Sequence, residues 1–141
     1  RYMKEPLQEI VRYAAQNIPG FAIRIHAGEN PYYAANPDLI DDWTFSNPYE
    51  AIQIIDEARR AGNGQYLGSY GDQVQIRIGH GRYGMHPQTL DLMSKTGTIS
   101  ELCLTSNYLL NHADHFQGPF AEYTERDVAY TLGSGLIKST I

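Results

Sequence analysis

The chain has 141 residues, of which 42% are hydrophobic and 19% charged, a composition typical of one globular domain with a sizeable core. Its net charge of −5 excludes a broad electrostatic surface for nucleic acid or anionic membranes. No apolar run approaches the ~18 residues of a membrane span. The one cysteine, Cys103, excludes an internal disulfide framework, and its place in an apolar run predicts a buried side chain. We therefore expect a cytoplasmic protein.

The first half of the chain predicts a helix, a strand, a long insert and a second helix. Apolar residues spaced three or four apart predict a helix over 5–18. Residues 21–25 predict a buried strand, and residues 30–47 form an irregular insert of the kind that is usually functional or mobile. The second helix is expected to begin after a cap at Ser46 or Asn47 and to end at Gly62.

The second half continues the alternation of strands and helices. Residues 74–78 alternate apolar and polar side chains and predict a strand that breaks at Gly79-His80-Gly81. The remaining elements are, in order, a helix over 87–95, a strand over 99–104, a mostly irregular stretch over 108–127 and a strand over 128–132. This alternation predicts an α/β fold in which crossover helices connect the strands of a parallel sheet.

Polar residues follow several of the predicted strands. Because parallel strands joined by crossover helices present their C-terminal ends on one side, we expect these residues to converge on one face of the sheet. They are His26, Glu29, His80, Ser106, Asn107 and Ser134.

Each of these residues has a structural interpretation beside the functional one. Alone, His26 is either a hydrogen-bonded loop residue or a metal ligand, and Glu29 is a solvated carboxylate or an acid. The two glycines around His80 are expected to expose its imidazole, as a general base or as part of a tight turn. Ser106 and Asn107 suit a helix cap or a turn.

Three motifs resemble the adenosine deaminase family, in the family's order and on consecutive predicted strands. They are Ile25-His26-Ala27-Gly28-Glu29, Arg77-Ile78-Gly79-His80-Gly81 and Glu101-Leu102-Cys103-Leu104-Thr105-Ser106-Asn107. The resemblance implies the C-terminal half of a (β/α)₈ TIM barrel of the metal-dependent amidohydrolase superfamily. Residues 1–141 would form about four βα units, with long inserts at 30–47 and 108–127. The insert at 30–47 and the connection over 63–72 are longer than compact family members need, so the resemblance extends to large divergent members of the antiviral-defence type.

The resemblance also implies a reaction and a set of residue roles. The reaction is the zinc-dependent hydrolytic deamination of adenosine, or of a related purine nucleoside or nucleotide, with release of ammonia. His26 would be a zinc ligand, Glu29 would protonate a purine ring nitrogen, and Gly28 would meet the purine through its backbone N–H. His80 would help deprotonate the attacking water, and Ser106-Asn107 would contact the substrate.

Two departures from the family pattern leave alternatives open. The family's His-x-His pair has no counterpart, and Leu132 leads into Gly133-Ser134-Gly135 where the family has paired aspartates. A catalytic zinc uses three protein ligands, and by this count the chain supplies one. Because a helical pattern starts almost at Arg1, we expect a piece of a longer polypeptide. Because one ligand cannot hold a catalytic zinc, we expect no activity from these residues alone. The alternatives are an inactive deaminase-like module for assembly or binding, with homo-oligomers as partners, and another metal hydrolase of the same superfamily.

Overall fold

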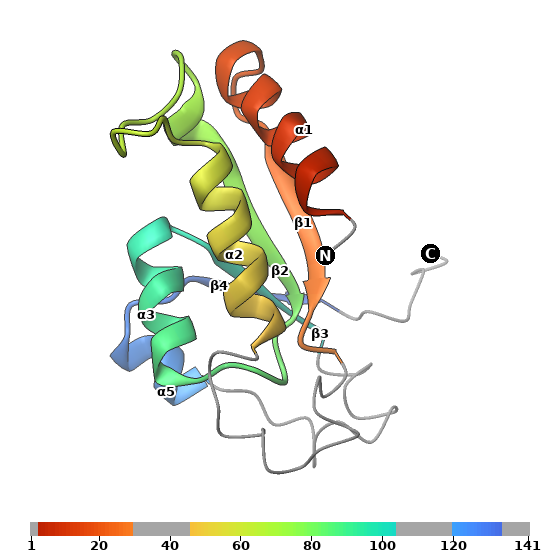
Figure 1. The fold of residues 1–141 in the computed structure, drawn as a ribbon. Coiled ribbons are helices and arrows are strands. Elements are labelled where there is room, and N and C mark those ends of the chain that lie inside the picture. Colours follow the sequence, from red (N-terminus) through yellow and green to blue (C-terminus); the bar gives the residue numbers. More distant parts are fainter. Residues whose placement is uncertain (1–2, 30–45, 104–119, 134–141) are drawn as a thin grey trace, which may run out of the picture.

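The computed structural model describes residues 3–29, 46–103 and 120–133, which form an α/β unit (Figure 1). The elements in chain order are α1 (Lys4–Asn17), β1 (Ala22–Ala27), α2 (Asn47–Ala58), the short 3₁₀ helix η3 (Gly71–Gln73), β2 (Gln75–His80), α3 (Pro87–Thr96), β3 (Ile99–Cys103), α5 (Phe120–Glu125) and β4 (Tyr130–Gly133). Among these residues no helix combines the length and the apolar character that a membrane span requires.

The four strands form one sheet in the order β1-β2-β3-β4, and every neighbouring pair is parallel. The predicted parallel sheet with crossover helices is therefore confirmed for the described residues. Strand neighbours in register carry their side chains on the same face. Arg24 pairs with Arg77, and Gly79 pairs with both His26 and Glu101, so these five positions share one face.

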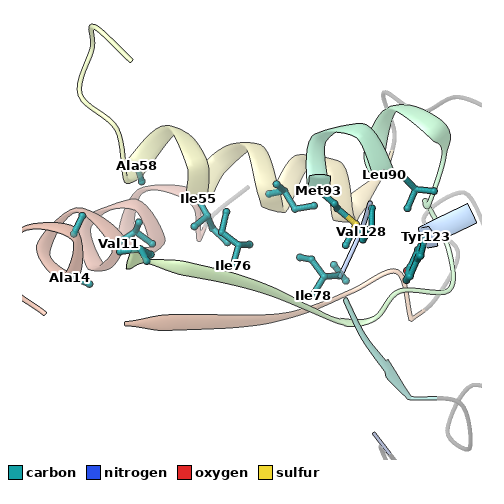
Figure 2. Close-up of a cluster of buried hydrophobic side chains, with 14 of the residues drawn as sticks. Val11, Ala14, Ile55, Ala58, Ile76, Ile78, Leu90, Met93, Tyr123 and Val128 are labelled. Carbon is teal, nitrogen blue, oxygen red and sulfur yellow. The ribbon is translucent and has the colours of Figure 1, made fainter. Parts of the chain in front are cut away.

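The opposite face of the sheet is packed against the helices and holds the apolar core. Ile76 and Ile78 of β2 are fully buried there and belong to one cluster with side chains from the helices. Figure 2 shows this cluster along the helix-covered face, with Val11, Ala14, Ile55, Ala58, Leu90, Met93, Tyr123 and Val128 labelled around the two isoleucines. Full burial of each such isoleucine contributes ~1.5–3 kcal/mol.

Both ends of α2 are fixed by polar side chains. Ser46 is the N-cap, and its Oγ accepts a hydrogen bond from the Tyr49 N–H at 3.2 Å, as predicted. At the other end, the buried Arg59 guanidinium donates to the carbonyl oxygens of Val74 at 2.8 Å and Thr96 at 2.7 Å. These bonds tie the end of α2 to the start of β2 and the end of α3.

The structure corrects several predicted boundaries. Helix α2 ends at Ala58 rather than at Gly62, and the Arg59 carbonyl oxygen accepts a hydrogen bond from the Leu67 N–H at 2.9 Å instead of continuing the helix. Helix α1 runs from Lys4 to Asn17 rather than over 5–18, and Ile10, one of the apolar residues of its periodic pattern, is 55% exposed. Part of the stretch predicted as irregular forms α5, which buries Tyr123 completely against the core.

Candidate metal centre

The two histidines lie inside the sheet rather than after it. Strand β1 runs to Ala27 and β2 runs to His80, so both strands are longer than predicted and end with the polar motif. His26 is exposed on the face of the sheet that the described helices leave open. Its neighbour in register on β2 is Gly79. The imidazole of His26 is therefore carried by a strand, which fixes its position more firmly than a loop would.

His80 adopts an unusual backbone conformation at the end of β2. Its φ is +73°, and the Gly81 N–H donates to the Gly79 carbonyl oxygen at 3.1 Å, which closes a γ-turn of the rare, strained kind. A non-glycine residue in such a conformation costs about 1–3 kcal/mol and persists only where neighbours hold it. Gly81, the last residue of the turn, packs closely against Ser100 and Tyr123. A Cβ added at Gly81 would lie 2.7 Å from Ser100 Oγ and 3.0 Å from Tyr123 Oη.

The expectation that two glycines expose His80 is wrong. The side chain is buried, with 4% of the residue exposed. The physical reason is that the absence of a Cβ at Gly79 and Gly81 admits close neighbours on both sides of the histidine, so the glycines permit burial instead of exposure.

Gly28 joins the segment after β1 to the segment after β2. Its carbonyl oxygen accepts hydrogen bonds from the N–H groups of Arg82 at 3.2 Å and Tyr83 at 2.8 Å. Its φ is +76°, and a Cβ would lie 2.3 Å from the Tyr83 carbonyl oxygen, so only glycine fits. This connection sets Glu29 beside the end of β2, where its Oε1 lies 3.5 Å from His80 Nε2. The contact of the Gly28 N–H with a purine stays a prediction.

The donor atoms of His26, Glu29 and His80 all lie within 4.8 Å of one another. The two imidazole rings meet edge to face, with centroids 5.0 Å apart and an interplanar angle of 80°. Two imidazoles and one carboxylate are a known donor set for catalytic zinc, and other divalent transition metals accept the same ligands. The described residues therefore fit a divalent metal, and they offer three donors where the sequence alone indicated one.

A cleft of about 360 Å³ opens over this face of the sheet. Cys103 lines it and is only half-buried, which contradicts the predicted core position. The reason is strand alternation, because Cys103 lies two residues after Glu101 and so shares its face. The lining residues are Arg24, His26, Arg77, Gly79, His80, Glu101, Cys103, Thr131 and Leu132.

Sequence reasoning missed the charged network on the floor of the cleft. The Glu101 carboxylate pairs with the guanidinium groups of both Arg24 and Arg77, and the Arg24 Nη2 to Glu101 Oε1 distance is 2.9 Å. Burial alone would raise the pKa of Glu101, but the hydrogen bonds from Arg77 and Arg24 outweigh it and hold the pKa below the ordinary 4.5. The sequence did contain a signal for this network, because one arginine interrupts each of two apolar strands: Arg24 in residues 21–25 and Arg77 in residues 74–78.

Of the residues expected to converge, the structure brings together His26, Glu29 and His80. The other three, Ser106, Asn107 and Ser134, lie outside the described residues. The chemical roles that the resemblance assigns to these residues stay predictions, and it assigns none to Ser134.

The fold and the site together define an α/β protein with a candidate metal centre at the C-terminal ends of two adjacent parallel strands. In comparisons with known proteins, no family model, curated protein or solved structure matches this chain. The resemblance to adenosine deaminases therefore rests on the three motifs and on their order in the chain.

Proposed function

We propose that this chain is part of a zinc-dependent hydrolase that deaminates adenosine or a related purine. The observation that supports it best is the cluster of His26, Glu29 and His80, whose donor atoms lie within 4.8 Å of one another. Hydrolytic deamination needs a metal ligand, an acid and a base around one reacting carbon, and these three side chains are of the required types.

We further propose that the sheet is the C-terminal half of a (β/α)₈ barrel. The strand order follows the chain order, and the core lies between one face of the sheet and its helices. A doubly wound sheet instead reverses its strand order and carries helices on both faces. In a barrel the face that bears His26 would look inward, and the cluster would lie at the C-terminal mouth, where barrel enzymes place their chemistry.

The proposed reaction assigns one task to each side chain. Zinc, when bound, would supply a nucleophile from water near neutral pH. His26 would hold the ion together with ligands from the rest of the full-length protein, because a catalytic zinc uses three protein ligands. Glu29 in its protonated form would donate to the purine ring nitrogen as the neighbouring carbon is attacked. His80 would accept a proton from the attacking water and pass it to the amine, so that the C–N bond breaks with release of ammonia. The remaining hydroxyl proton would return to Glu29 as the oxo-purine forms.

The alternative is an inactive deaminase-like module that serves assembly or binding. One observation favours it: in the sequence, Leu132 leads into Gly133-Ser134-Gly135, where the resemblance requires two aspartates. Metal content separates the two proposals, because the module needs no metal.

The test measures metal content and ammonia release from adenosine in the full-length protein. We expect one zinc per chain, its loss in His26→Ala, and its retention in Glu29→Gln with a fall in rate of about 10²-fold or more. Glu9→Gln, an exposed carboxylate on α1, is the matched control and should match the unsubstituted protein.

Each contradictory result has its own meaning. A full-length protein that takes up no zinc would refute the hydrolase and leave the module. An unchanged rate in Glu29→Gln would show that Glu29 is not the acid, whereas loss of zinc in that variant would make it a ligand.

A further inference from the structure

We propose that Gly79 is a positioning residue for the metal centre, because the missing side chain at this position makes room for the His26 imidazole. The inference rests on the proposed metal-dependent function. It adds Gly79 to the residues that determine metal affinity, and Gly79 acts on that affinity only by positioning His26. Gly79 itself contributes no donor atom to the site.

The space that a side chain at Gly79 would occupy is filled by the imidazole of His26. The two residues are partners in the β1–β2 register. An added Cβ would lie 2.7 Å from His26 Cδ2, 3.3 Å from Nε2 and 3.4 Å from Cγ, and these are its three nearest atoms. The shortest of these distances is closer than real Cβ contacts allow, so any other residue at position 79 would force the ring to move.

The backbone gives no reason for glycine at this position. Gly79 is not among the residues with positive φ, in contrast to Gly28 and Gly81 on either side of the site. Glycine inside a strand lowers stability relative to alanine, and it often marks a place where another group approaches closely. At Gly79 the approaching group is the His26 imidazole.

The displaced ring would leave the fold largely intact. His26 is exposed toward the cleft, so its imidazole can rotate away without disturbing the core. The metal centre tolerates much less, because a ligand moved by a fraction of an ångström no longer shares one ion with its neighbours. Alanine at position 79 should therefore separate metal affinity from stability.

The experiment is a Zn²⁺ titration of the full-length protein, together with thermal unfolding of the metal-free form. In Gly79→Ala we expect ~10–100-fold weaker zinc binding, the range measured when the support of a ligand is altered. The melting temperature should be unchanged or raised by about 2–4 °C, because alanine restricts the unfolded chain. The matched control is Gly62→Ala, where an added Cβ meets no atom within 4 Å and φ is ordinary. It should bind zinc normally.

Two results would overturn the proposal. One is zinc binding by Gly79→Ala that equals that of the unsubstituted protein. The other is weaker binding that comes with a large fall in melting temperature, since that would make Gly79 a structural residue.

A second measurement keeps this inference separate from the proposed function. In the metal-free protein, the Hδ2 proton of His26 should show a nuclear Overhauser effect to the Hα protons of Gly79. If this effect is present and the ring shifts in Gly79→Ala, the positioning role holds even when no variant binds zinc, and only the metal-dependent function fails. If the effect is absent, Gly79 does not seat His26.

Discussion

On one face of the sheet Ile76 and Ile78 are fully buried under the helices, whereas on the other face Arg24 and Arg77 line an open cleft around Glu101. Strand β2 contributes to both faces, because Ile76, Arg77 and Ile78 are successive residues whose side chains alternate between them. Parallel strands are usually apolar on both sides, because both faces are covered. The difference indicates that the helix-covered face supplies most of the stability, whereas the cleft face carries charged and polar groups.

The largest effect that tests this comparison is expected on the covered face. Ile76→Ala leaves a cavity among fully buried side chains and should lower the free energy of unfolding by ~2–5 kcal/mol. Urea denaturation measures the change. The matched control is Ile10→Ala on α1, where the side chain is 55% exposed, and it should change the free energy by no more than ~0.5 kcal/mol. Equal losses in the two variants would mean that the covered face is not the core.

Local patterns in the sequence predicted the elements of the fold well. Residues a few positions apart determine the helical period of the first helix, the alternation in residues 74–78 and the Ser46 cap. The structure confirms a helix, a strand and an N-cap at these places. The convergence of His26 with His80 also followed, because parallel strands place their C-terminal ends together.

Contacts that depend on strand register could not be predicted. In the sequence, nothing distinguishes Glu101 from the other residues of its short strand. Its pairing with Gly79 in the β2–β3 register places its carboxylate beside Arg24 and Arg77, which come from other strands. The burial of His80 depends on the same long-range packing, since the Tyr123 hydroxyl beneath its turn comes from α5, a helix in a stretch without a periodic apolar pattern. The arginines inside the apolar runs signal a charged partner nearby, but sequence spacing identifies neither Glu101 as that partner nor the contact with Tyr123.

A smaller effect, with a distinct pH dependence, is expected on the cleft face. Glu101→Gln removes charge-assisted hydrogen bonds to two guanidinium groups and should cost ~1–3 kcal/mol at pH 7. The folded protein holds the pKa of Glu101 below its ordinary value of 4.5. The carboxylate therefore stabilises the fold above about pH 4.5, and this stabilisation is lost as the pH falls through the lowered pKa.

Urea denaturation of Glu101→Gln beside the unsubstituted protein, at pH 7 and at steps down to pH 3, follows this loss. The difference between the two proteins should shrink toward zero in acid, because a protonated Glu101 resembles glutamine. A difference that stays constant across the series would show that the charge on Glu101 contributes nothing. Glu9→Gln on α1 controls for the general effect of removing a surface carboxylate.

The smallest effect concerns a buried polar pair on the covered face, beneath the site. The Tyr123 hydroxyl and Ser100 Oγ are 3.0 Å apart under the His80 turn. Tyr123→Phe keeps the ring and removes this bond, so it should cost ~1 kcal/mol at neutral pH. Burial raises the pKa of Tyr123 to about 12, although the Ser100 hydrogen bond lowers it in part. Tyrosine in the unfolded chain ionises near 10.0, so the stability that the hydroxyl contributes is complete below pH 10 and is lost as the pH rises toward 12.

Thermal unfolding of the Tyr123→Phe variant between pH 8 and pH 12 checks both parts of this prediction. The variant should be the less stable protein at pH 8, and the difference should shrink and then reverse as the pH approaches 12. Ser100→Ala is the companion variant, because it removes the same bond and leaves the buried phenol. At pH 8 its free energy of unfolding should fall by a similar amount. Its stability should still decline as the pH rises toward 12, because the buried phenol is retained. A parallel pH response in all three proteins would show that Tyr123 is not the buried phenol that the packing around His80 requires.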